Sequence, residues 1–112
     1  MKKPPPPKTP PAPPHLSPEA RDWWERILRE WVLDDPSLLL LQAALESFDR
    51  MNAARLIVEA EGIVVRDRWG QLRPNPAVLA ERDSRTAMCR ALKQLGLDLE
   101  PLGSIGRPPG GS

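Results

Sequence analysis

Residues 59–76 decide the fold of this chain, and they read Glu-Ala-Glu-Gly-Ile-Val-Val-Arg-Asp-Arg-Trp-Gly-Gln-Leu-Arg-Pro-Asn-Pro. A helix-forming run ends at Gly62, since glycine commonly stops helices. A short β-branched run then turns at Gly70, which is typical of a β-hairpin. Asn75 caps the next helix and Pro76 suits its first position. The hairpin strands are expected at residues 63–65 and 71–73.

Three helices are predicted around this hairpin, which makes the fold class all-α. The first spans about 17–33, begins at Ser17, and carries three tryptophans in an apolar stripe at helical spacing. The second spans about 36–61, and its opening turn, Leu38–Leu41, is apolar on every side, so we expect burial on more than one face. The third spans about 76–95. Its expected apolar face consists of Leu79, Met88, Ala91, Leu92 and Leu95.

The folded domain is expected over residues 15–99. Residues 1–14 contain lysines and a proline-rich run, which predicts an extended, disordered basic arm. Such an arm could touch DNA phosphates, bind a proline-recognising module, or act only as a solubilising tail. Residues 100–112 are rich in glycine and proline and are expected to form a flexible tail.

Composition argues against several classes of protein. The chain has one cysteine, Cys89, and one histidine, so neither a disulfide nor a Cys/His metal site is expected. Cys89 falls within a predicted helix, where burial as a small apolar residue is the ordinary expectation. No phosphate-binding glycine loop, secretory signal or membrane span is evident. We therefore expect no cofactor, no enzyme activity, no membrane association and a cytoplasmic location.

The order of these features resembles the small subunit of tailed-phage terminases. The resemblance covers roughly residues 15–107 and depends on order and spacing, because no single piece is specific. Its parts are Leu16-Ser17-Pro18-Glu19-Ala20, the long Leu/Ala-rich helix, Glu61-Gly62 with the hairpin, Asn75-Pro76, Leu95-Gly96-Leu97, and the ending at Leu97-Asp98-Leu99-Glu100-Pro101 and Ile105-Gly106-Arg107-Pro108. The resemblance implies a non-catalytic, helical subunit that assembles into a homo-oligomeric ring. Its implied partners are double-stranded viral DNA and the large terminase subunit, which holds the ATPase and nuclease, within the host cell cytoplasm.

Basic side chains gather in the second half of the chain. Net charge is +1, but residues 63–95 hold seven bases and three acids. The second helix opens with leucines, whereas a recognition helix needs polar side chains there, so we expect DNA contact through these bases. The candidates are Arg66, Arg68, Arg73, Arg82, Arg85, Arg90 and Lys93, together with Trp69 at the hairpin tip. Alternatively, the arginines pair with acids and Trp69 packs on a helix.

Large apolar side chains in the first two helices are the candidates for a subunit interface. They are Trp24, Trp31, Leu38, Leu40, Leu41, Leu45 and Phe48. Two other functions remain compatible with the sequence. One is a small dimeric helical DNA-binding transcriptional regulator, and the other is a protein-binding scaffold that never touches DNA.

Overall fold

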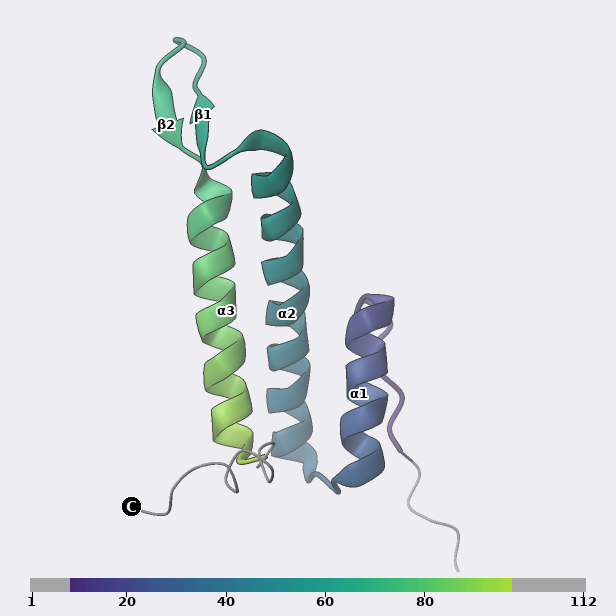
Figure 1. Ribbon diagram of the computed structural model, residues 1–112. Coiled ribbons are helices and arrows are strands. Elements are labelled where there is room, and N and C mark those ends of the chain that lie inside the picture. The colour runs from purple at the N-terminus through teal and green to yellow at the C-terminus, as the bar shows by residue number, and fades with distance from the viewer. Residues whose placement is uncertain (1–8, 98–112) are drawn as a thin grey trace, which may run out of the picture.

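The computed structural model describes residues 9–97, which form three helices and one two-stranded ribbon (Figure 1). The predicted all-α class, with a short hairpin between the second and third helices, is confirmed. Residues 1–8 and 98–112, which include most of the predicted arm and the predicted tail, lie outside the described residues. The elements are α1 (Pro18–Glu30), α2 (Asp35–Glu61), β1 (Val64–Arg66), β2 (Leu72–Pro74) and α3 (Pro76–Leu95).

Each helix begins at a polar cap followed by proline in the first turn. Ser17 accepts a hydrogen bond from the Ala20 amide at 3.0 Å, and Asp34 accepts one from the Ser37 amide at 2.9 Å. These bonds satisfy backbone donors that a helix leaves unpaired at its start. The helix starts are therefore encoded locally.

α1 ends at Glu30, three residues before the predicted boundary. Trp31 is extended, with φ −130° and ψ 139°, and both Trp31 and Leu33 pack against the core. Residues two apart on a helix point to different sides, whereas in an extended chain they share one side. Leaving the helix thus lets Trp31 and Leu33 both reach the core.

The core lies where α1 packs on the first half of α2. Leu16 and Leu41 are the largest fully buried side chains, and Trp24 is 4% exposed. Trp23 is 44% exposed, so the three tryptophans of the predicted stripe are not equally buried. Neighbouring helical positions differ by about 100°, and only one of two adjacent tryptophans can face the partner helix. The buried cluster consists of Leu16, Ala20, Trp24, Ile27, Leu41 and Leu45.

Two carboxylates of α2 hold the start of α1. Asp49 accepts hydrogen bonds from the Ser17 amide at 2.8 Å and from its hydroxyl at 2.5 Å. Glu46 lies 2.7 Å from His15 Nε2 and 3.0 Å from Gln42 Nε2. The hydrogen bond from Gln42, followed by that from His15, lowers the pKa of Glu46. Polar contacts thus anchor the start of α1, while the apolar core packs the helix along most of its length.

Residues 9–14 contact the folded domain, whereas composition predicts that they belong to a disordered arm. Trp24 Nε1 donates to the Pro10 carbonyl at 2.9 Å, and Arg21 Nη2 donates to the Pro14 carbonyl at 3.2 Å. Ala12 packs against the core cluster. Proline leaves its carbonyl available as an acceptor, and the buried indole of Trp24 needs such a partner. This part of the proline-rich segment therefore belongs to the folded domain.

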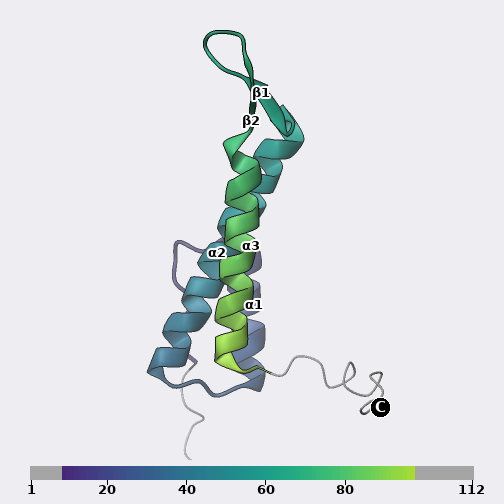
Figure 2. The ribbon, with the colours of Figure 1, turned by 90° about the vertical axis from the view of Figure 1, so that its left-hand side faces the viewer.

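α2 and α3 run antiparallel, side by side, for most of their length (Figures 1 and 2). Small residues, among them Ala54, Ala77 and Ala91, are buried on these helices. The prediction that Cys89 is buried is wrong, and Leu79 is 51% exposed rather than on the inner face. Ala77, Met88 and Ala91 lie on the side of α3 that faces α2. Cys89 is rotated by about 100° from Met88 about the helix axis and is therefore exposed.

Asn75 joins α2, the ribbon and α3. Its Nδ2 donates to the Gly62 carbonyl and its amide to the Ile63 carbonyl, both at 2.8 Å, while its Oδ1 accepts from the Ala77 amide at 3.0 Å. The residue is only 4% exposed, so these bonds form away from water. One side chain therefore caps α3 and ties it to the end of α2.

We predict that Asn75→Ala lowers the free energy of unfolding by about 2–3 kcal/mol, because a helix cap is removed and the Gly62 carbonyl is left without its partner. Urea unfolding followed by circular dichroism at fixed protein concentration measures the change. Asn52→Ala, which removes the same amide from within α2, is the control and should cost clearly less. Equal stability of the Asn75 variant and the wild type would contradict this role.

Candidate nucleic-acid interface

The β-ribbon projects beyond the ends of α2 and α3 (Figures 1 and 2). Val64 pairs with Pro74, Val65 with Arg73 and Arg66 with Leu72, in antiparallel register. Each strand starts one residue later than predicted, a shift of the size that is usual at element ends. The projection places the ribbon's side chains where a large ligand can reach them.

Asp67 organises the tip of the ribbon. Its carboxylate accepts hydrogen bonds from the Trp69 amide at 2.9 Å, the Gln71 amide at 3.0 Å and Arg73 Nε at 2.8 Å. Arg66 Nη1 donates to the Gly70 carbonyl at 2.6 Å across the same loop. Gly70 has φ 78°, a conformation that favours glycine. Arg66 and Arg73 therefore both contribute to the shape of the loop.

The hydrogen bond from Arg73, followed by those from the Gln71 and Trp69 amides, lowers the pKa of Asp67. The Asp67 side chain is 15% exposed, whereas that of Arg73 is 59% exposed. Asp67 thus stays ionised at neutral pH and neutralises part of the positive charge at the tip. Of the three ribbon arginines, only Arg68 makes neither an ion pair nor a hydrogen bond within the described residues.

Trp69 presents its ring to solvent at the tip. The side chain is 70% exposed, and the Arg68 guanidinium carbon lies 4.9 Å from the ring centroid. This is the geometry of a cation–π contact, which holds the two groups together as one surface. An exposed aromatic ring beside an arginine can stack on a base or lie against a nucleic-acid groove.

A second basic surface lies on the outer face of α3. Arg82, Arg85, Arg90 and Lys93 are all exposed, and their spacing places them within an arc of about 140° on the helix. Arg85 pairs with Glu81 at 3.1 Å and Arg82 with Asp83 at 3.6 Å. Such exposed pairs contribute at most about 1 kcal/mol each, so phosphates can compete for these arginines. No ion pair of Arg90 or Lys93 is found within residues 9–97.

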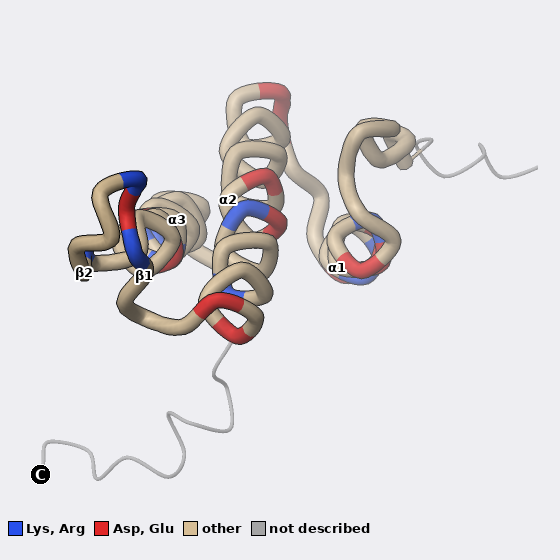
Figure 3. The backbone as a smooth tube through the Cα atoms, turned by 90° about the horizontal axis from the view of Figure 1, so that it is seen from above, with Lys and Arg blue, Asp and Glu red and all other residues tan. Residues whose placement is uncertain are grey.

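The eight candidates for DNA contact thus form two groups. One consists of Arg66, Arg68, Trp69 and Arg73 on the ribbon, and the other follows α3 for about 16 Å from Arg82 to Lys93. Figure 3, viewed from above, shows basic residues on either side of one acidic residue on the ribbon, and mixed charges on α1 and α2. Because the ribbon continues from the start of α3, a long ligand lying along that helix would meet both groups.

The candidates for a subunit interface fall into buried and partly exposed residues. Trp24, Leu41 and Leu45 are 0–5% exposed within the chain's own core. Trp31, Leu38 and Phe48 are partly buried against that core, and Leu40 is half-buried. Leu39 is 69% exposed, a feature that an all-apolar turn cannot reveal in sequence.

Apolar residues around the ribbon are a further exposed group that the sequence did not single out. Ile63, Val64, Leu72, Pro74 and Val78 line a shallow hollow at the base of the ribbon. Leu56 and Ile57 at the end of α2 are also exposed, by 57% and 44%. The run of three apolar residues at 63–65, followed later by Leu72 and Pro74, is the sequence signal that could have indicated this surface.

Metal sites and membrane-spanning helices are both absent from residues 9–97. No group of three or more histidine, cysteine, aspartate or glutamate side chains there is arranged to hold a metal ion. None of the described helices combines the length and apolar character needed to cross a membrane.

Comparison with known proteins gives the class to which this fold and site belong. Residues 20–102 match the family described as phage terminase, small subunit. The match includes nearly all of α1 and the whole of α2, the ribbon and α3. The chain therefore belongs to the phage terminase small subunit family. Neither the curated proteins nor the solved structures yielded a match.

We predict that the ribbon tip loosens when Asp67 loses its charge. Because the folded-state pKa of Asp67 is lowered, its contribution is present above the ordinary carboxyl pKa and is lost as pH falls through the lowered value, below about pH 4. The amide NMR signals of Trp69 and Gln71 should move toward unstructured positions in this range, and Asp67→Asn should shift them at neutral pH. Asp83→Asn is the control and should leave the Trp69 and Gln71 signals where they are in the wild type. If Asp67→Asn also leaves these signals unmoved, Asp67 does not organise the tip.

Proposed function

We propose that this protein is the non-catalytic adaptor of a phage DNA-packaging apparatus, which binds double-stranded viral DNA and recruits and regulates the large terminase subunit. The observation that supports DNA binding best is the projecting ribbon, whose tip presents Arg68 and Trp69 to solvent. Membership of the terminase small subunit family supplies the packaging context.

The two basic surfaces suit contact with a DNA backbone. An arginine guanidinium group can donate two parallel hydrogen bonds to one phosphate (bidentate binding). Such contacts position a protein on DNA without reading its sequence. The α3 surface supplies four cations along one side of the helix. Arg90 and Lys93 make no ion pair within residues 9–97, so binding a phosphate would not require them to give one up. Trp69 adds a contact of a different kind, because its ring can wedge against or stack on a base.

We also propose that the chain forms a ring with copies of itself. The molecule is elongated, because α2 alone, with 27 residues, is about 40 Å long, and large apolar side chains are exposed at both ends of this helix. Apolar surface of this kind commonly marks a protein–protein contact. A ring needs two different surfaces that meet in a repeating, closing arrangement. Leu39 and Leu40 lie at one end of α2, and the ribbon hollow lies beyond the other.

The large terminase subunit is the proposed protein partner, and the host cytoplasm the proposed location. Both proposals follow from family membership and the packaging role, since packaging of viral DNA takes place while virions assemble. In this proposal no residue of the chain carries out a catalytic step.

We predict that Arg82→Gln, Arg85→Gln, Arg90→Gln and Lys93→Gln combined weaken binding to duplex DNA and reduce its salt dependence. For every phosphate that the variant no longer neutralises, the slope of log affinity against log salt should become shallower by about 0.9. Fluorescence anisotropy with a labelled duplex across a salt series measures both the affinity and the slope. Arg68→Ala with Trp69→Ala tests the ribbon tip separately, because neither residue shapes the loop through an ion pair.

The matched control removes charge from other faces. Arg29 on α1 and Arg55 on α2 are exposed, and Arg29→Gln with Arg55→Gln should leave the salt slope near that of the wild type. If the control weakens binding as much per charge as the α3 variant, attraction is general and no DNA surface exists on α3. Absence of DNA binding by the wild type would favour a protein-binding scaffold instead.

We predict that native mass spectrometry of the purified chain detects a closed assembly larger than a dimer. Leu40→Asp should reduce the mass of this assembly. The helix content should stay unchanged, because Leu40 lies outside the buried cluster. Circular dichroism checks the helix content. A wild-type dimer, with or without duplex DNA, would instead support the dimeric regulator, and an unchanged mass for the variant would remove Leu40 from the interface.

A further inference from the structure

The loop at the tip of the ribbon is closed by its own backbone. The Asp67 amide donates to the Gln71 carbonyl, and the Gly70 amide donates to the Asp67 carbonyl, both at 2.9 Å. The Asp67 carboxylate adds hydrogen bonds from the Trp69 and Gln71 amides. The backbone of the loop is thus fixed before a ligand arrives, which lowers the entropy cost of binding through its side chains.

Three side chains of this loop take no part in shaping it, and they belong to Arg68, Trp69 and Gln71. The Trp69 ring is 70% exposed, and Arg68 and Gln71 are exposed as well. The Gln71 carboxamide, like the Arg68 guanidinium, makes no hydrogen bond within residues 9–97. The tip therefore presents a guanidinium group, an indole ring and a carboxamide on a fixed backbone.

The contact between Arg68 and Trp69 orients the guanidinium group without using its hydrogen-bond donors. The guanidinium carbon lies 4.9 Å from the centroid of the Trp69 ring. A cation–π contact holds the group through its charge, so the N–H groups of the guanidinium fork remain available for a ligand. Arg68 is thus held in place and still able to donate two parallel hydrogen bonds.

These three chemical groups are the ones that recognise base pairs in the major groove of DNA. Arginine donates two hydrogen bonds to O6 and N7 of guanine, glutamine pairs with N6 and N7 of adenine, and apolar side chains contact the thymine methyl group. The minor groove presents almost the same pattern for A·T and T·A pairs. Phosphate contacts, which the bases on α3 can make, carry no sequence information. The ribbon tip is therefore the part of the candidate interface that is equipped for sequence recognition.

The size and charge of the tip also fit the major groove. This groove is about 12 Å wide and 8.5 Å deep and admits a two-stranded β-ribbon, whereas the minor groove is about 6 Å wide. The chain from Arg66 to Trp69 spans at most about 10 Å, so the tip can reach base edges while Val64 and Pro74 stay outside. Three arginines against Asp67 give the ribbon a net charge of +2, which favours approach to DNA.

We propose that the ribbon tip enters the major groove of duplex DNA and recognises its sequence, with Arg68 on a guanine, Gln71 on an adenine and Trp69 against a thymine methyl group. Gln71 is the residue that this assignment adds to the candidates for DNA contact. The inference rests on the proposed function, because it requires that the protein binds duplex DNA. It assigns sequence recognition to the ribbon and sequence-independent attachment to the bases on α3.

The first test measures whether the tip determines sequence preference. Selection from a random-sequence duplex pool by the full-length protein should enrich a short motif that contains guanine and adenine. Arg68→Ala with Gln71→Ala should reduce the preference for the selected duplex over a scrambled one by about tenfold or more. The control, Arg82→Gln with Lys93→Gln, should weaken binding to both duplexes by the same factor. A preference that survives in the tip variant would overturn the proposal.

Gln71→Lys gives a readout that a merely structural role would not produce. Lysine donates to O6 and N7 of guanine, so this substitution should change the preferred base pair at one position of the motif from A·T to G·C. A repeated selection with the variant measures the change. The same preferred base pair at every position would overturn the assignment of Gln71.

Methylation interference with dimethyl sulfate on the selected duplex identifies the groove. The reagent methylates N7 of guanine, which lies in the major groove, and N3 of adenine, which lies in the minor groove. Methyl groups on guanine N7 should prevent binding, whereas those on adenine N3 should not. The reverse pattern would overturn the proposal and place the tip in the minor groove.

Failure of this inference is distinguishable from failure of the proposed function. If the protein binds all duplexes with equal, salt-dependent affinity, the tip recognises no sequence, and the inference is overturned while DNA binding stands. If the protein binds no duplex, DNA binding itself fails and the inference fails with it.

Discussion

The hydrogen bonds of Asn75 are the constraint on which the arrangement of this protein depends. The side chain caps α3 and donates to the Gly62 carbonyl, while the backbone amide of Asn75 donates to the Ile63 carbonyl at the base of the ribbon. The direction of the ribbon relative to the helix pair is thereby set by one buried residue. Without it, two three-residue strands would have little to hold them, because a lone hairpin is marginal in water.

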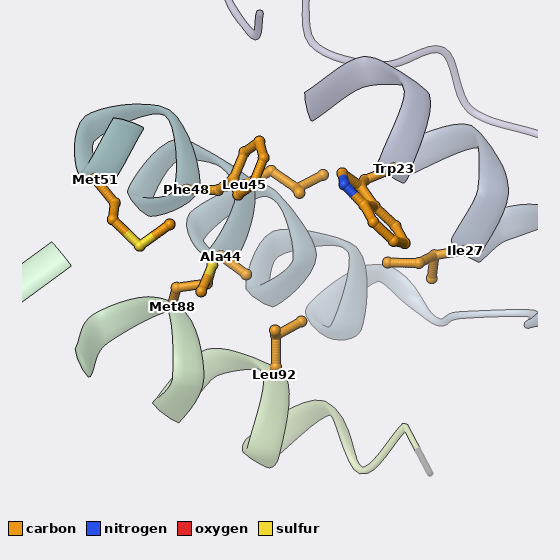
Figure 4. Close-up of a pocket in the computed structure, with 8 residues that line it drawn as sticks. All are labelled: Trp23, Ile27, Ala44, Leu45, Phe48, Met51, Met88 and Leu92. Atoms are coloured by element: carbon orange, nitrogen blue, oxygen red, sulfur yellow. The ribbon is translucent and has the colours of Figure 1, made fainter. Parts of the chain in front are cut away.

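A second set of contacts, partly polar and partly apolar, holds α1 against α2. His15 and Ser17 bind carboxylates in the middle of α2, and Trp24 packs in the apolar core between α1 and the first half of α2. The other side of α1 borders an apolar groove, and Trp23, which lines this groove, is 44% exposed (Figure 4). α1 therefore packs on α2, and the apolar groove separates it from α3. The ribbon, which we propose contacts DNA, and this groove lie at different parts of the molecule.

Local chemistry explains why the elements were predictable and the surfaces were not. Caps and prolines at Ser17, Asp34 and Asn75 define helix starts through bonds to residues two or three positions away. Burial depends on the rotation of each helix against a partner that lies far away in sequence. This is why Cys89 and Leu79 proved exposed, and why Trp24 and Leu41 belong to the chain's own core rather than to a surface. The candidate DNA residues were chosen from the sequence as one set, and DNA contact by them stays a prediction. Their division into a ribbon group and a helix group comes from the structure alone.

The sequence by itself determined the order of elements and the turn at Gly70, because these depend on residue types at short spacing. It also determined membership of the terminase small subunit family, which depends on the order of these pieces along residues 20–102. Only the tertiary structure decided that the Pro10 carbonyl pairs with Trp24, that Arg73 is held by Asp67, and that three helices enclose an apolar groove. Those outcomes depend on which faces meet when helices pack. The physical reason is that packing is a property of pairs of distant surfaces, whereas capping and turning are properties of neighbouring residues.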